Sequence, residues 1–154
     1  MENVWDYPRP PRLEPAARRV RVQFGDVTIV DSTGALRVLE TSHPPVLYLP
    51  PQDIAAGALQ PSTHRQTFCE WKGMATYFDV VAGDDIAPAA AWTYREPVPA
   101  FAELRDHVAF YPERMDACFL DDELVQAQPG DFYGGWVTSD IGGPFKGAAG
   151  SLSW

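Results

Sequence analysis

Polar and apolar residues alternate along several short stretches of the chain, which is the spacing of half-buried β-strands. Residues 19–24 alternate in this way, Gly25-Asp26 is typical of a turn, and residues 27–30 return as the second strand of a hairpin. Residues 35–40 predict a third strand, with a helix as the alternative. Further extended stretches are predicted over residues 46–49, 67–71, 75–81, 90–94, 116–120 and 123–125.

Helical spacing is clearest near residues 100–109. Phe101, Leu104 and Val108 fall on one helix face, just after two prolines. Residues 52–59 predict one or two further helical turns. Because strands and helices do not alternate along the chain, a parallel doubly wound sheet is not expected. The pattern predicts a mainly β (α+β) fold, in which antiparallel sheets of short strands accompany one short helix near 100–109.

Fifteen prolines and twelve glycines among 154 residues indicate short elements and many loops. The length is that of one domain, and we expect residues 1–154 to form a single domain. Residues 1–17 predict a proline-rich arm, in which Trp5 and Tyr7 should pack on the rest of the chain. Residues 129–154 predict an irregular extension wrapped over the body by its large rings, which are Phe132, Tyr133, Trp136 and Phe145.

The formal net charge is −9, and the acidic residues are concentrated beyond residue 37. An acidic body repels phosphate backbones, so we expect no nucleic-acid partner. The N-terminus lacks the apolar core of a secretory signal, and no apolar run approaches the ~20 residues that span a membrane. Two cysteines without a C-x-x-C pair favour neither a disulfide scaffold nor a structural zinc. We therefore expect a soluble, cytoplasmic protein without a membrane partner, a metal or a cofactor.

The stretch from Thr67 to Tyr77, T-F-C-E-W-K-G-M-A-T-Y, gathers the most reactive side chains. On a continuous strand, alternation places Cys69 and Trp71 on one face and Glu70 and Lys72 on the other. A thiol nucleophile needs a nearby base or cation. For catalysis by Cys69, His43 is the candidate base and Glu40 the candidate orienting group. The alternative is that Cys69 packs as a small hydrophobic residue.

Lys72 and Gly73 allow a second kind of chemistry. A partly buried Lys72 could bind an anion or form a Schiff base, whereas an exposed one would pair with Glu70 or another acid. Gly73 would let the chain bend. The three histidines lie far apart in sequence and show no zinc-ligand spacing.

Aromatic residues occur on four of the predicted strands. Rings that converge on one sheet face form either a core or a pocket, and Trp and Tyr favour half-buried positions that line clefts. The candidate ligand-binding residues are Tyr48, Trp71, Lys72, Tyr77, Trp92 and Tyr94.

Four motifs occur in order: E-T-S-H-P-P at 40–45, C-E-W-K-G at 69–73, A-W-T-Y at 91–94 and V-A-F-Y at 108–111. Together they resemble domain-of-unknown-function family 427 over residues 19–126. The segments V-W-D-Y-P-R-P-P and F-Y-G-G-W-V-T-S-D are similar to those of its longer members. The resemblance implies a β-tent-like domain, in which two antiparallel sheets meet at an angle and are open along one side. The zinc pairs of many β-tent proteins are absent from this sequence.

The family has no settled function, although the label nucleotidyltransferase has been attached to it. That chemistry uses metal-bound carboxylates spaced as D-x-D on a strand. The acid pairs here, Asp84-Asp85 and Asp121-Asp122, are adjacent and fall in predicted turns, so the label is disfavoured.

The sequence therefore favours a domain that binds a small organic ligand in an aromatic-lined pocket. One alternative is a thiol-dependent enzyme that uses Cys69 with His43. The other is a protein-interaction or homodimer scaffold that uses the arm and the F-Y-G-G-W segment.

Overall fold

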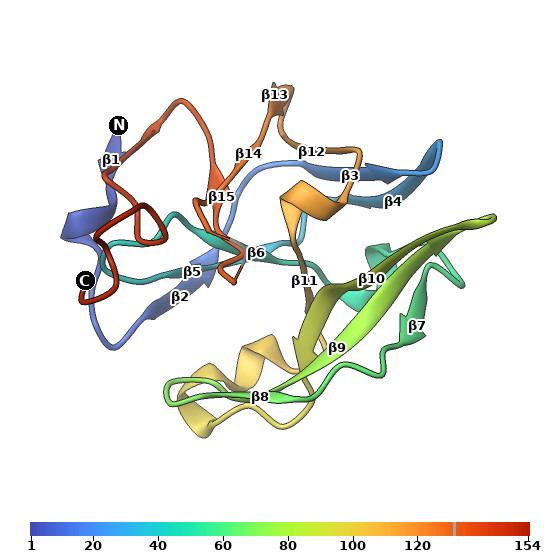
Figure 1. Cartoon of the computed structure of the whole chain (residues 1–154), viewed down its shortest axis with the longest axis horizontal. Coiled ribbons are helices and arrows are strands. Elements are labelled where there is room, and N and C mark those ends of the chain that lie inside the picture. The colour runs from blue at the N-terminus through green and yellow to red at the C-terminus, as the bar shows by residue number, and fades with distance from the viewer. Residues whose placement is uncertain (131) are drawn as a thin grey trace.

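A computed structural model describes residues 1–130 and 132–154 (Figure 1). The chain is mainly β, as the alternation predicts. Its largest sheet has the strand order β11-β10-β9-β7, with β8 also paired to β9. Its strands are β7 (Leu59–Pro61), β8 (Thr67–Cys69), β9 (Gly73–Ala82), β10 (Asp85–Tyr94) and β11 (Val108–Phe110). All pairings in this sheet are antiparallel.

Two smaller antiparallel sheets complete the body of the fold. One has the order β13-β12-β3-β4 and the other β2-β5-β6. The first consists of β3 (Val20–Phe24), β4 (Val27–Ser32), β12 (Ala117–Leu120) and β13 (Glu123–Leu124). The second consists of β2 (Arg12–Pro15), β5 (Leu36–Leu39) and β6 (Val46–Tyr48). In Figure 1 the sheet with β9 and β10 lies below the sheet with β3, β4 and β12, and β11 runs between them.

The β3–β4 hairpin confirms the first sequence prediction. Val22 pairs with Val30, and a bulge follows at Gln23. Gly25 and Asp26 have φ values of 56° and 61°, which are the left-handed angles that a type I′ turn requires. The strand predicted at 35–40 is also confirmed as β5, and its helical alternative is wrong.

The helix near residue 100 is shorter and tighter than its pattern indicates. A 3-10 helix, η3, spans Pro99–Leu104, and Phe101 inside it leaves helical geometry with φ −117°. Val108 instead begins β11, where it pairs with Thr93 of β10. Phe101, Leu104 and Val108 are all buried. Val108 is buried by its place in the sheet and not by a helix face. Strand pairing over a long sequence distance thus overrides the local helical spacing.

The remaining helices are also single 3-10 turns. They are η1 (Val4–Asp6), η2 (Pro51–Asp53) and η4 (Pro112–Arg114). Proline occupies the start of the last two, where its missing N–H costs no hydrogen bond. In the part of the chain that the structure describes, no helix combines the length and the apolar character needed to cross a membrane.

Buried side chains form separate clusters. The largest lies among β3, β4, β6, β10, β11 and β12 and consists mainly of aliphatic residues. A second, the aromatic cluster, is built around Tyr48, Tyr77, Trp92, Tyr94 and Tyr111. A small third cluster joins Val4 and Tyr7 of the N-terminal arm to Leu39 and Ile141.

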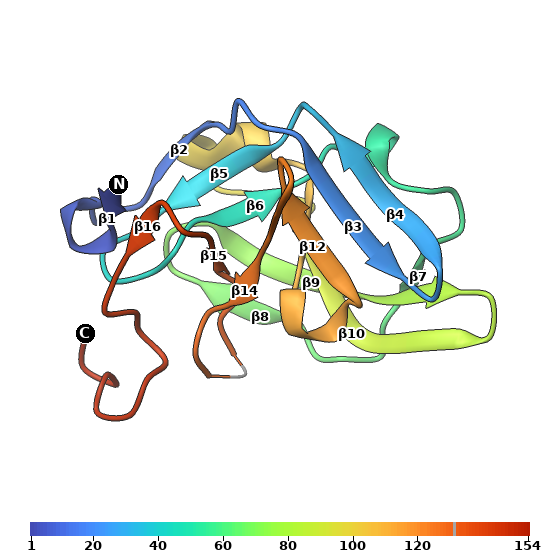
Figure 2. The ribbon, with the colours of Figure 1, turned by 90° about the horizontal axis from the view of Figure 1, so that it is seen from above.

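The two ends of the chain meet on one side of the molecule (Figure 2). Strand β1 (Glu2–Asn3) pairs in parallel with β16 (Ile141–Gly142). Nearby, β14 (Gln126–Ala127) pairs with β15 (Trp136–Val137). Trp5 is 41% exposed, but its indole nitrogen donates to the Pro144 carbonyl and its ring packs edge-on against Trp154.

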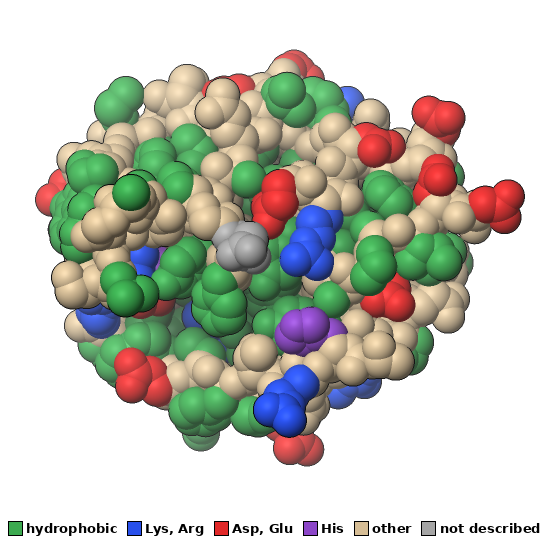
Figure 3. Space-filling model, viewed as in Figure 1, with side chains coloured by type: hydrophobic (Ala, Val, Ile, Leu, Met, Phe, Trp, Pro, Cys, Tyr) green, Lys and Arg blue, Asp and Glu red, His purple; other side chains and the backbone are tan. Residues whose placement is uncertain are grey.

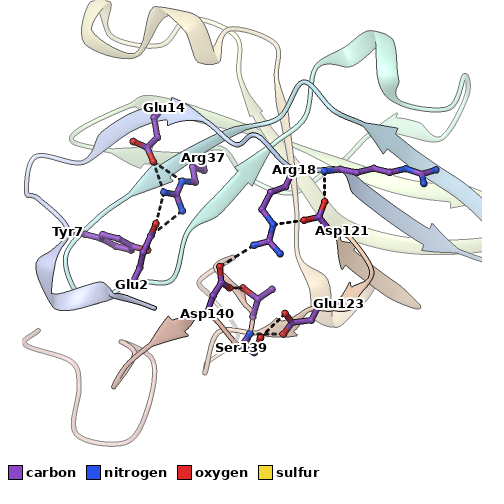
Figure 4. A network of polar contacts seen from close by, with 11 residues as sticks. Glu2, Tyr7, Glu14, Arg18, Arg37, Asp121, Glu123, Ser139 and Asp140 are labelled. Atoms are coloured by element: carbon purple, nitrogen blue, oxygen red, sulfur yellow. Dashed lines mark hydrogen bonds and ion pairs between the residues drawn. The ribbon is translucent and has the colours of Figure 1, made fainter.

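Ion pairs reinforce this junction of the terminal segments (Figure 4). Arg37 of β5 contacts Glu2 at 2.9 Å and Glu14 at 2.6 Å, so it ties β1 to β2. Arg18 contacts Asp121 at 2.9 Å and Asp140 at 3.2 Å. The two arginines therefore connect both terminal segments to the central strands.

Candidate ligand-binding site

A cavity of about 510 Å³ lies beside the aromatic cluster. In Figure 3 the surface is hollowed on this side, and hydrophobic side chains surround the hollow. The segment through β5 and β6, the β8–β9 hairpin, β10 and the C-terminal extension all contribute walls. All nine candidate residues line this cavity: Tyr48, Trp71, Lys72, Tyr77, Trp92 and Tyr94, together with Glu40, His43 and Cys69.

The rings reach the cavity because of strand geometry. Trp92 and Tyr94 are two residues apart on β10 and therefore point to the same face. Tyr77 of β9 is the direct cross-strand partner of Trp92. The Trp92 ring lies 4.6 Å from that of Tyr111 and 6.3 Å, edge-on, from that of Tyr48. These are the separations at which aromatic pairs attract each other.

The hydroxyls of Tyr48, Tyr94 and Tyr111 remain protonated. Burial, followed by the nearby Tyr48, raises the pKa of Tyr94 far above its ordinary value. Burial also raises the pKa of Tyr48 and of Tyr111. The cavity wall therefore presents neutral O–H groups, which can donate hydrogen bonds to a ligand as well as accept them.

The chain turns between Cys69 and Gly73. The prediction that Cys69 and Lys72 lie on opposite faces of one continuous strand is therefore wrong. Cys69 ends β8, Gly73 begins β9, and the two residues pair with each other. The Lys72 N–H donates to the Cys69 carbonyl at 3.3 Å, and Gly73 leaves the turn with φ 115°. Alternation does not hold through a turn, so Lys72 lies on the same side as Cys69, against the prediction.

Lys72 is only 8% exposed, whereas Glu70 is on the surface. The interpretation of Lys72 as a surface lysine paired with Glu70 is therefore wrong. Its ammonium lies 5.9 Å from the centre of the Tyr94 ring. No carboxylate in residues 1–130 or 132–154 forms an ion pair with it.

Lys72 nevertheless keeps its charge. Burial opposes the ammonium form, but Tyr48, Cys69 and the more distant Glu40 outweigh burial and raise the pKa of Lys72. A lysine that forms a Schiff base must lose its proton at neutral pH. The raised pKa of Lys72 therefore favours an anion-binding role over a nucleophilic one.

His43 is held in one orientation at the cavity wall. Its Nδ1 lies 3.0 Å from the Thr41 carbonyl, so Nδ1 must carry the proton, and its ring packs edge-on against Tyr133. Burial lowers the pKa of His43, although Glu40 opposes this shift. The neutral ring leaves Nε2 as a proton acceptor.

Glu40 is not hydrogen-bonded to this histidine. Its carboxylate lies 3.9 Å from the His43 ring and 3.4 Å from Arg9. The Thr41 carbonyl therefore orients the ring, and Glu40 contributes its charge. Cys69 is half-buried beside the aromatic cluster, and the cation with which it interacts is Lys72.

One wall of the cavity comes from residues that the sequence did not single out for the site. In the C-terminal extension, Gln128, Tyr133, Gly134 and Lys146 line it. Gln128 is buried, where its side chain accepts from the Gly135 N–H and donates to the Lys146 carbonyl. A Cβ atom on Gly134 would collide with the Trp92 ring. The adjacent glycines of F-Y-G-G-W were the available signal, since two glycines between rings indicate close packing.

Metal chemistry receives no support from the described residues. None of their His, Cys, Asp and Glu side chains gather in groups of three or more that could hold a metal ion. Asp121 is bound by Arg18 and by the Arg19 N–H, and Asp122 is fully exposed. Both pairs of adjacent aspartates lie at hairpin turns, as the sequence predicts.

Comparison with known protein families identifies the family of the chain. No curated protein matches the chain. A family model described as "Domain of unknown function (DUF427)" matches residues 12–121. This range contains the four motifs and most of the cavity wall, whereas the wall from the C-terminal extension lies beyond it. The chain belongs to the DUF427 family.

Proposed function

We propose that this protein binds a small organic ligand in the cavity beside the aromatic cluster. The observation that carries the proposal is a cavity of about 510 Å³ whose walls combine rings from different strands with polar side chains such as His43 and Lys72. Ligand sites typically have volumes of roughly 300–1,000 Å³ and combine apolar walls with a small number of placed polar groups. A purely structural core would bring such rings into contact and leave no such space.

The composition of the wall favours a ligand with a flat, unsaturated part. Trp92 and Tyr111 offer broad ring surfaces in the cavity wall, and the tyrosine hydroxyls offer hydrogen bonds at the ring edges. His43, whose neutral ring is fixed through Nδ1, adds a proton acceptor. These groups suit a molecule of one or two rings with polar substituents.

A thermal-shift screen with small aromatic metabolites tests the proposal. Val46 lines the cavity and is half-buried, so Val46→Trp should fill the space and abolish the rise in melting temperature. Ile86 is 60% exposed and lies outside the cavity lining, so Ile86→Trp is the matched control and should keep the rise. The proposal fails if no compound stabilises the wild-type protein, or if Val46→Trp responds as the wild type does.

A second candidate function is thiol chemistry by Cys69. It rests on the interaction of Cys69 with the Lys72 ammonium in a cavity that His43 also lines, since a thiolate requires such a cation or base. Alkylation of the folded protein can test it, because the other thiol should not react. Cys118 is 1% exposed, and burial raises the pKa of that thiol to about 12.

The measurement is the rate of iodoacetamide labelling in Cys118→Ala, with and without the further change Lys72→Met. If Lys72 activates the thiol, its removal should slow labelling near neutral pH. An unchanged rate would remove the thiol candidate and leave the binding proposal untouched.

A further inference from the structure

Lys72 differs from the other basic residues of the described chain in how its charge is compensated. Six arginines form ion pairs with carboxylates, and each of these six is at least partly exposed. Among the described residues, Lys72 is the one lysine or arginine that is buried, and it has no ion pair. Burying a charge without a counter-ion is costly. The buried ammonium of Lys72 therefore requires another source of stabilisation.

The groups around the ammonium are neutral donors and acceptors rather than acids. Tyr48 and Tyr94 lie beside it, and Cys69 also interacts with it. Glu40 makes a smaller electrostatic contribution, and its carboxylate already forms an ion pair with Arg9 at 3.4 Å. The cavity therefore contains a fixed positive charge whose partner the described residues do not supply.

We infer that the ligand carries a single carboxylate, which pairs with the Lys72 ammonium while its ring lies among the aromatic residues. This inference rests on the proposed function, because it concerns the same cavity. The Tyr94 ring lies 5.9 Å from the ammonium. Tyr48, which interacts electrostatically with the cation, offers a hydroxyl that can donate a further hydrogen bond to the carboxylate. An ion pair reinforced by such bonds is the arrangement in which a buried charge becomes favourable.

A carboxylate fits this cavity better than a phosphate does. Lys72 is a single point charge, and among the described residues no arginine lines the cavity to bind two phosphate oxygens at once. Lys146, the second lysine of the lining, is engaged elsewhere, because its ammonium donates to the Trp154 carbonyl at 3.0 Å. The chain as a whole has a net charge of −9, which opposes the entry of more highly charged anions.

The inference is tested by titrating the wild-type protein with matched compounds that share one ring system. The probes are 2-naphthoate, 2-naphthamide and 2-naphthyl phosphate, and the readout is calorimetry or tryptophan fluorescence. We expect the carboxylate to bind about tenfold to a hundredfold more tightly than the amide, as for hydrogen bonds to a charged group. The phosphate should bind more weakly than the carboxylate.

Variants then test whether Lys72 causes the preference for the carboxylate over the amide. Lys72→Met should remove the advantage of the carboxylate and leave amide binding within about twofold, because the two side chains are similar in length. Arg95→Met is the matched control, since it removes an exposed basic side chain that does not line the cavity, and it should keep the preference. A variant that does not fold does not affect the test, because the comparison of acid with amide uses the wild-type protein.

The outcomes separate the two claims. Equal binding of acid and amide would overturn the carboxylate inference and leave the binding proposal standing. Tighter binding of the phosphate would overturn it in favour of phosphate esters. Retention of the acid preference by Lys72→Met would also overturn it. If none of the probes binds, and the wider screen finds no ligand, both claims fail.

Discussion

Two of the cavities in the described part of the chain are lined by cations that differ in how their charges are paired. The first contains Lys72 among aromatic rings, without a carboxylate partner in the described chain. The second, of about 300 Å³, is lined by Arg18 and Arg37 at the junction of the terminal segments. There, each arginine is bound by two carboxylates (Figure 4).

This difference separates a structural role from a binding role. In the second cavity, the ion pairs connect β1, β2 and the C-terminal extension to the central strands, and their charges satisfy each other. In the first, the charge remains available inside a wall of rings. A cation that lines a cavity is not by that fact evidence for a ligand site. It becomes evidence when it is buried and no carboxylate of the described chain pairs with it.

The largest effect is expected where the wall of the first cavity is tightest. Gly134→Ala would place a methyl group against the Trp92 ring, and overpacking of this kind destabilises a protein by about 3 kcal/mol. Urea unfolding measures the change. Gly34→Ala is the control, because its added methyl group would meet no atom closer than 3.4 Å. Equal stability of the two variants would show that the extension does not pack on Trp92.

In the second cavity, Arg37→Met should destabilise the fold by about 2 kcal/mol, because Glu2 and Glu14 would lose their shared partner. Urea unfolding again gives the value. Arg12→Met is a suitable control, since Arg12 has a weaker, more exposed contact with Glu14 at 3.3 Å. If Arg37→Met were as stable as the wild type, the ion pairs would not hold the terminal segments.

Lys72→Met should change stability much less. The raised pKa of Lys72 indicates that the fold accommodates its charge, but the side chain has no ion pair to lose, and an apolar side chain of similar length would fill the same buried space. The free energy of unfolding of the ligand-free protein should therefore change by less than about 1 kcal/mol. The same unfolding experiment measures it, in buffer without organic acids. A loss of stability comparable to that of Arg37→Met would mean that Lys72 is a structural cation and would abolish the contrast between the cavities.

The smallest effect concerns pH. Hydrogen bonds from Arg37 hold the pKa of Glu2 below its ordinary value of 4.5. A lowered pKa contributes stability above the ordinary value, and this contribution disappears as the pH falls through the lowered one. The destabilisation by Arg37→Met should therefore shrink between pH 7 and pH 3. The small effect of Lys72→Met should barely change with pH, because the raised pKa of Lys72 lies far above this window.

The local alternation of polar and apolar residues was sufficient to predict most of the strands. Residues 20–24 and 27–32 form a hairpin because their alternation and their Gly25-Asp26 turn agree with each other. The spacing of Phe101, Leu104 and Val108 was misleading, because burial of the third residue depends on pairing with β10, which helical periodicity does not reveal. Elements set by long-range pairing are the ones that local spacing predicts least well.

Some residues of the candidate site could be predicted from the sequence, and others could not. Its rings were predictable, since Trp and Tyr on several strands tend to converge. The position of Lys72 was not, because a three-residue turn after Cys69 replaces the assumed strand and reverses the direction of the side chain. Lys146 and Gln128 were also not predictable, since only the folded path of the C-terminal extension brings them to the cavity.

The wall contributed by residues 128–146 has a practical consequence for protein engineering. The cation and most of the rings belong to the part of the chain that the DUF427 model matches, whereas Gly134 and its neighbours lie outside it. Replacing only the side chains of the extension that line the cavity, such as Tyr133 and Lys146, would change one wall and keep the charged interior. A library of such variants is thus a direct route to altered selectivity, because the packing of Gly134 against Trp92 stays in place.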